Sequence, residues 1–126
     1  MFLPVSNEQV EATVRRYLEL VSEGTAEEIA VMYAEDAVLE DPVGSEPRRG
    51  REAIKGFYAT IEPMKIATEL QIIRVCGGEA AFKFRIETDT GAGVAVLEPF
   101  ENMVIGEDGL VTSMRAWWND GDMTFA

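Results

Sequence analysis

Asp41 is the first of three side chains whose position in the sequence could serve proton-transfer chemistry. It follows a short apolar run at residues 37–39 and stands directly before Pro42, where a loop punctuated by glycine and proline begins. A proline disfavours the helical region for the residue before it, so the Asp41 carboxylate should stand at the end of a strand on a constrained backbone. That is a plausible position for a catalytic base, and it is also the position of an ordinary strand-ending turn.

A second carboxyl group, Glu101, stands in a row of apolar side chains that includes Leu97 and Met103, on one face of a strand expected over residues 92–105. If that row faces the interior, loss of solvation raises the pKa of Glu101 and keeps it protonated, so that it can donate a hydrogen bond. The alternative is a glutamate at the sheet edge with its carboxylate in water. Glu98, on the opposite face, is a rival for the buried role.

The third side chain is Tyr17, on the apolar face of the first expected helix. From its spacing alone, the simplest interpretation is a core aromatic residue whose hydroxyl finds one partner. The chain contains no histidine, which excludes Ser–His and Cys–His nucleophiles and the usual histidine-containing metal sites. Acid–base chemistry must therefore come from carboxylates, tyrosines or lysines.

The elements that must position these groups are three helices followed by strands. The first helix should begin at a capping box of Ser6 and Gln9 and end at Gly24, and the second should begin at Thr25 and carry Tyr33. The third follows an arginine-rich segment and should end at Pro63. Strands are expected at about residues 65–76, 79–89, 92–105 and 110–119. This order predicts an α+β domain with the helices on one side of an antiparallel sheet.

The composition limits the class of protein and its partners. At 126 residues, 47% of them hydrophobic, the sequence predicts a single domain over residues 1–126 with one hydrophobic core. The formal net charge of −12 argues against nucleic acid and anionic membranes as partners. The arginines at positions 48, 49 and 51 are therefore expected to neutralise nearby carboxylates. With one cysteine, Cys76, no signal-peptide pattern and no apolar run of spanning length, a cytoplasmic location is expected.

Several stretches match those of a known family: residues 16–17, 32–37, 40–47, 56–58 and 113–116. In them the chain resembles the bacterial steroid Δ5-isomerases, or ketosteroid isomerases, of the nuclear transport factor 2-like and SnoaL-like superfamily. The stretch 36–47 is the most specific, because the wider superfamily shares the fold but not that loop. The resemblance implies a cone-shaped fold in which three N-terminal helices pack on a curved, mainly antiparallel sheet.

The resemblance also implies roles for individual residues in isomerising 3-oxo-Δ5 steroids to their Δ4 isomers. Asp41 corresponds to the general base that carries a proton from C4 to C6. Tyr17 corresponds to the oxyanion-hole tyrosine that donates to the steroid O3 as the dienolate forms. Glu101 falls where the family keeps a protonated aspartate as the second donor, and its extra methylene is a departure from the family. Tyr33 and Tyr58 correspond to tyrosines that extend the hydrogen-bond network in some members.

A small apolar steroid ketone needs an apolar cavity, and no metal or organic cofactor is expected because one carboxylate can perform both proton steps. The candidate lining residues are Phe57, Tyr58, Phe84, Phe100, Met103, Met114 and Trp118.

Two other interpretations stay open. One keeps the fold and changes the chemistry to that of a polyketide cyclase-like or hydrolase-like enzyme. The other is a non-catalytic module for binding small ligands or for dimerisation. On any of these interpretations the open face of the sheet, with Trp117 among its apolar side chains, predicts a homodimer.

Overall fold

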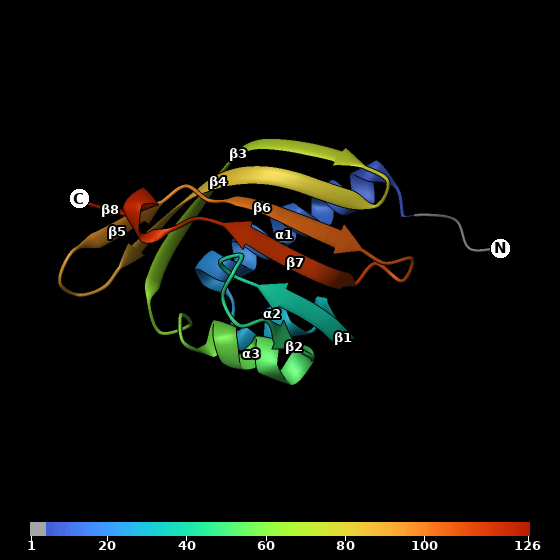
Figure 1. Cartoon of the computed structure of the whole chain (residues 1–126), viewed down its shortest axis with the longest axis horizontal. Coiled ribbons are helices and arrows are strands. Elements are labelled where there is room, and N and C mark those ends of the chain that lie inside the picture. Colours follow the sequence, from blue (N-terminus) through green and yellow to red (C-terminus); the bar gives the residue numbers. More distant parts are fainter. Residues whose placement is uncertain (1–4) are drawn as a thin grey trace.

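The computed structural model describes residues 5–126, and it contains helices on one side of a curved sheet (Figure 1). Its elements in chain order are α1 (Asn7–Glu23), α2 (Ala26–Ala30), β1 (Tyr33–Glu40), β2 (Arg48–Arg49), α3 (Arg51–Ala59), β3 (Lys65–Cys76), β4 (Glu79–Asp89), β5 (Val94–Leu97), β6 (Phe100–Ile105), β7 (Val111–Trp117), the short 3-10 helix η1 (Asp120–Asp122) and β8 (Thr124–Phe125). The predicted α+β class, with three N-terminal helices on a curved and mainly antiparallel sheet, is confirmed.

Both predicted capping boxes are present. The Ser6 hydroxyl accepts from the backbone N–H of Gln9, whose side chain accepts from the backbone N–H of Ser6, and Thr25 and Glu28 make the same reciprocal pair. Tyr17 lies on the buried face of α1, at 3% exposure. These caps fix where α1 and α2 begin, and therefore the level at which Tyr17 enters the core.

Two helix ends differ from the expectation. Tyr33 was expected in the second helix but is the first residue of β1, because α2 is only five residues long and the backbone N–H of Val111 bonds the carbonyl of Met32, which draws the chain into the sheet. The third helix ends at Ala59 rather than at Pro63, and the residues between them form turns.

The sheet runs in the order β2-β1-β7-β6-β4-β5-β8, and β3 also pairs with β4. Strands β1 and β7 are parallel, whereas the other pairs are antiparallel. Because β1 and β7 run in the same direction, their carboxyl ends lie at the same edge of the sheet, and the residues that follow them start close together. Asp41 follows β1 and Trp118 follows β7, so the fold brings together two residues that are far apart in the sequence.

The single strand expected over residues 92–105 is wrong, because the chain forms two strands there. β5 pairs with Ile86–Asp89 of β4, and β6 pairs with Glu79–Lys83. Glu98 and Pro99 lie between them, and proline has no N–H to donate to a ladder. The Pro99 carbonyl still accepts from the backbone N–H of Phe84, at a donor–acceptor distance of 3.4 Å. The break lets β4 change partner as the sheet curves.

After β7 the chain turns through η1 and returns as β8, which pairs with β5 through Ala95 and Phe125. The carboxyl-terminal end therefore lies beside the β4–β5 hairpin, on the side of the molecule opposite the start of α1 (Figure 1). Within residues 5–126, every helix is too short or too polar to cross a bilayer.

Candidate active site

A cavity of about 240 Å³ lies between α1, α3 and the covered face of the sheet. Ten of its lining residues are apolar and five are polar. The apolar ones are Val21, Phe57, Ile61, Phe84, Ile86, Ala95, Leu97, Pro99, Trp118 and Met123. The polar ones are Tyr17, Asp41, Tyr58, Thr88 and Glu101. A largely apolar wall with a few polar groups is typical of a site for a small organic molecule.

Asp41 is held at the end of β1 by the neighbouring strand. The indole Nε1–H of Trp118 donates to Asp41 Oδ1 at 2.7 Å, and the backbone N–H of Val43 donates to the carbonyl of Ala116 at 2.7 Å. Burial raises the pKa of Asp41, while the Trp118 hydrogen bond and the positive charge of Arg48 act in the opposite direction. With one oxygen bound by Trp118, the second carboxylate oxygen is left to accept a proton.

Glu101 is buried at 4% exposure, as the alternation along β6 predicts, and its Oε1 has no hydrogen-bond partner within residues 5–126. Burial raises the pKa of Glu101 well above that of a free glutamate, and the negative charge of Asp41 raises it further. This shift favours the neutral carboxylic acid, whose O–H could donate into the cavity that Glu101 lines.

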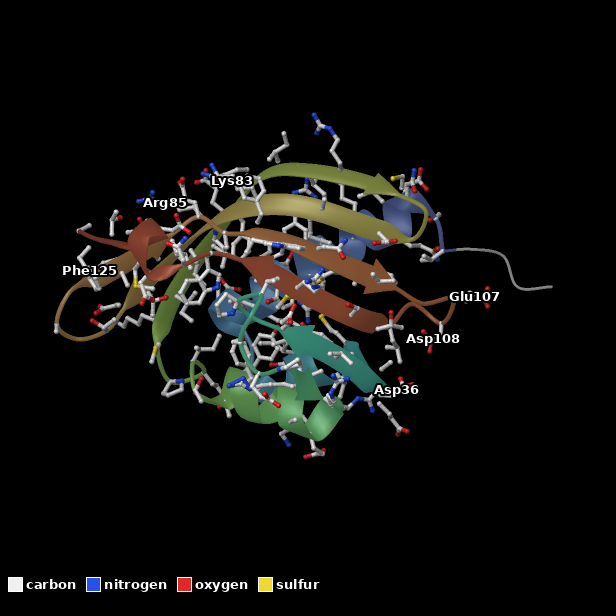
Figure 2. All side chains as sticks on the ribbon, viewed as in Figure 1. Asp36, Lys83, Arg85, Glu107, Asp108 and Phe125 are labelled. Atoms are coloured by element: carbon white, nitrogen blue, oxygen red, sulfur yellow. The ribbon has the colours of Figure 1, made fainter. Side chains whose placement is uncertain are left out.

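Glu98, the rival, lies on the outer face of the sheet. It accepts from the Gln71 side chain at 2.9 Å and contacts Lys83 and Arg85 at 3.6 and 3.5 Å. Figure 2 shows Lys83 and Arg85 on β4, away from α3. The alternative in which Glu98 is the buried carboxyl group is therefore wrong.

Three buried tyrosines form a chain behind the cavity. The hydroxyl of Tyr58 lies 3.0 Å from that of Tyr17 and 2.7 Å from that of Tyr33. Burial raises the pKa of all three phenols, so they stay protonated at neutral pH. Tyr17 and Tyr58 line the cavity and Tyr33 lies behind them. Each hydroxyl has one proton to donate, so a donation from Tyr17 into the cavity is compatible with its accepting from Tyr58.

Four of the seven expected lining residues line the cavity: Phe57, Tyr58, Phe84 and Trp118. Phe100 does not, because it points from β6 to the outer face and is 56% exposed. Met103 and Met114 do not line it either, because they pair across β6 and β7 and are fully buried in the core. Phe100 also pairs with the exposed Trp117, so both lie on the face through which the homodimer is predicted, and that assembly stays a prediction.

Other lining residues were missed, and two periodicities could have found some of them. Val21 and Ile61 stand four residues after Tyr17 and Phe57 at helical spacing, and Ile86 and Thr88 continue the alternation that starts at Phe84. Met123 comes from the carboxyl-terminal segment, where no pattern indicated a contact.

The arginines that were expected to neutralise carboxylates also make contacts with uncharged groups. Arg51 donates twice to the backbone carbonyl of Tyr33, at 2.9 and 2.7 Å, and the Arg48 guanidinium lies 4.7 Å from the ring centre of Phe57. Arg48 thus covers a cavity wall from outside while its charge acts on Asp41. Within residues 5–126 no three His, Cys, Asp or Glu side chains gather as a metal site.

Chemically, the cavity combines two carboxyl groups and a phenol with apolar surroundings. Asp41 can accept a proton, and Tyr17 and Glu101 can stabilise an oxygen that gains negative charge. The low polarity of the wall strengthens both interactions. This set of groups suits proton abstraction next to a carbonyl.

Comparison with solved structures shows the same fold. The epoxide hydrolase/cyclase-like enzyme SalBIII, which has a role in pyran ring formation in the polyether salinomycin, is 24% identical with a TM-score of 0.84, over 94% of this chain and 97% of that one. RV0760c from Mycobacterium tuberculosis is 20% identical with a TM-score of 0.88, over 97% of this chain and 99% of that one.

Comparison of the sequence gives the family. A model described as the SnoaL-like domain matches residues 14–114. The Steroid Delta-isomerase of Nocardioides simplex is 49% identical over 115 residues, which cover 91% of this chain and 94% of that relative. The chain therefore belongs to the SnoaL-like domain family and is an isomerase within it.

Proposed function

We propose that this isomerase converts 3-oxo-Δ5 steroids to the conjugated 3-oxo-Δ4 steroids by moving a proton from C4 to C6. The observation that carries the proposal is that the carboxyl group of Asp41, the buried carboxyl group of Glu101 and the buried phenol of Tyr17 line one largely apolar cavity. The 49% identity to a protein named Steroid Delta-isomerase supports the choice of substrate.

In the first step Asp41 removes a proton from C4. The electron pair of the C–H bond forms the C3–C4 double bond, and the carbonyl electrons move to O3, which becomes the oxyanion of a dienolate. Tyr17 and Glu101 donate hydrogen bonds to that oxygen. Because these donors are neutral and fixed in an apolar wall, they stabilise the charged dienolate more than the neutral ketone, and this difference lowers the barrier.

In the second step the newly protonated Asp41 returns the same proton to C6. The C3–O3 double bond re-forms and the remaining double bond comes to lie between C4 and C5, in conjugation with the carbonyl. Proton and electrons balance without any further reactant. The Trp118 hydrogen bond to Oδ1 keeps the carboxyl group over the ring face during both transfers.

Burial also explains why the two carboxyl groups take different roles. Asp41 keeps partial solvent access, a hydrogen bond from Trp118 and the field of Arg48, which together favour its charged form. Glu101 has none of these and faces the charge of Asp41, so it stays protonated. The longer glutamate still serves as a donor, provided that its extra methylene folds against the apolar wall.

Substituting the base tests the proposal directly. Asp41→Asn keeps the shape and the Trp118 contact but removes the basic oxygen, so kcat for a 3-oxo-Δ5 steroid should fall by about 10³-fold. The rise in conjugated-enone absorbance measures this. Asp36→Asn, at an exposed aspartate of β1 labelled in Figure 2, is the matched control and should keep full activity.

Two results would overturn the proposal. If the wild type adds nothing to the buffer rate, the ligand is not a 3-oxo-Δ5 steroid, and the cyclase-like or binding-module alternatives return. If Asp41→Asn keeps the wild-type rate, another group moves the proton.

A further inference from the structure

We propose that Thr88 forms a polar subsite at the far end of the cavity and selects steroids that carry an oxygen substituent at C17. The inference rests on the proposed function, because it takes a 3-oxo steroid as the ligand. It adds a residue that decides which of these steroids the enzyme prefers.

The position of Thr88 follows from the register of β4. Phe82, Phe84, Ile86 and Thr88 alternate onto the covered face, and the last three line the cavity. Phe82 is directly opposite Glu101 on β6. Thr88 stands six residues further along the strand, about 20 Å by strand rise. Glu101 and Thr88 therefore lie toward opposite ends of the part of the cavity wall that runs along β4.

The surroundings of Thr88 are apolar. It pairs with Ala95 across β4 and β5, and Ile86 precedes it on the same face of β4. Of the five polar lining residues it is the one that belongs to this β4–β5 end. A half-buried hydroxyl in such a place loses hydration when an apolar ligand covers it.

The hydroxyl of Thr88 also differs from those of other partly buried threonines of the sheet. Thr68 donates to the carbonyl of Leu18 at 3.0 Å, and Thr112 donates to that of Val104 at 3.3 Å. Within residues 5–126, Thr88 donates to no such carbonyl. Its hydroxyl is thus available to a ligand, as donor to a ketone or as acceptor from an alcohol.

The shape of a steroid connects the two ends. Its four fused rings form a rigid, elongated skeleton with C3 at one end and C17 at the other. If O3 is bound at Tyr17 and Glu101, a skeleton that follows the cavity-lining residues Phe84, Ile86 and Thr88 of β4 brings its C17 end toward Thr88. A ligand with oxygen at C17 keeps the hydroxyl hydrogen-bonded, whereas one without it leaves that hydroxyl covered and unpaired, which disfavours binding.

The experiment compares two steroids that differ only at C17: a 3,17-dioxo-Δ5 steroid and its 17-deoxy counterpart. The ratio of their kcat/KM values is measured for the wild type, Thr88→Val and Thr88→Ser. Valine has the shape of threonine without the hydroxyl, so the ratio should fall by about fivefold, the effect of one neutral hydrogen bond. Serine keeps the hydroxyl and should keep the ratio.

Thr124→Val is the matched control, because Thr124 lies exposed on β8, outside the cavity, and its substitution should leave the ratio unchanged. If the wild type and Thr88→Val have equal ratios of kcat/KM for the two steroids, the subsite is overturned. Isomerisation of these steroids by the wild type would still support the proposed function. Failure of the wild type to isomerise either steroid would overturn the proposed function and the subsite together.

Discussion

Glu98 and Glu101 are three residues apart in the sequence and occupy opposite chemical environments. Glu98 lies on the outer face, where the hydrogen bond from Gln71, followed by the charges of Lys83 and Arg85, lowers its pKa. Glu101 lies in the cavity, where burial raises its pKa and no residue among 5–126 bonds its Oε1. The two surroundings thus shift the pKa of the same side chain in opposite directions, toward the ion on the outer face and toward the neutral acid in the cavity.

The difference shows that the position in the sheet, not the residue type, decides what a glutamate does here. Glu98 lies in the break between β5 and β6 and faces outward, whereas Glu101 lies on β6 and faces the cavity. The outer face supplies cations and water, whereas the cavity supplies apolar side chains and the negative charge of Asp41. A carboxyl group in the second environment can act as a hydrogen-bond donor to an oxyanion.

A first test replaces each glutamate by leucine and measures kcat with a 3-oxo-Δ5 steroid. Glu101→Leu removes the proposed oxyanion donor, so kcat should fall by about 10²-fold. Glu98→Leu should change kcat by less than about twofold, because it removes only partly exposed ion pairs. A similar loss of kcat in both variants would mean that the loss at Glu101 comes from disturbed folding rather than from the missing O–H. A changed far-ultraviolet circular dichroism spectrum would then show the disturbed fold.

A second test uses the pH dependence of the free energy of unfolding. The native state holds the Glu101 proton over a pH range in which the unfolded chain has released it, so this group makes stability fall as pH rises above about 5. Relative to Glu101→Gln, the wild type should lose about 1.4 kcal/mol per pH unit in that range, the value for one proton. Urea unfolding between pH 5.5 and 8 measures the slope.

Glu98→Gln is the control for this slope. The pKa of Glu98 is lowered in the native state, so its stabilisation is present above the unfolded pKa and disappears only as the pH falls through the native pKa. The difference from wild type should therefore stay flat between pH 5.5 and 8. A flat line for Glu101→Gln as well would show that Glu101 is ionised in the native protein.

A third test compares the neighbouring arginines Arg48 and Arg49 by the pH dependence of kcat/KM. The charge of Arg48 lowers the pKa of Asp41, so Arg48→Gln should raise that pKa and move the acid limb of kcat/KM to higher pH. The maximal kcat/KM should fall by less than about threefold, since the Trp118 bond stays. Arg49→Gln should leave the limb in place, and a shift of equal size there would reflect only the loss of net charge.

Much of the frame could be predicted from the sequence. The capping boxes located the first two helices, and the glycine-rich turns located the ends of β3, β4 and β6. Alternation put Glu101 in an apolar row and Glu98 on the opposite face, but it left open which of the two is buried, because the pattern alone does not show which face is covered. These are local signals, and each depends on residues close in the sequence.

The parts of the site that could not be predicted from the sequence depend on contacts between distant segments. The bond from Trp118 to Asp41 joins residues 77 positions apart and follows from the parallel pairing of β1 with β7. Tyr33 was assigned to a helix because the apolar spacing continued past α2, but a backbone bond from Val111 places it in the sheet. Met123 reaches the cavity only because β8 pairs with β5.

The parallel pairing of β1 and β7 also affects the order in which the protein becomes active during synthesis. Asp41 leaves the ribosome well before Trp118 and Ala116, the residues that fix its carboxyl group and the loop after it. Contacts of such high sequence separation form late, since a long loop must close before they stabilise anything. The contacts that hold Asp41 are therefore complete only after β7 has been synthesised and has paired with β1.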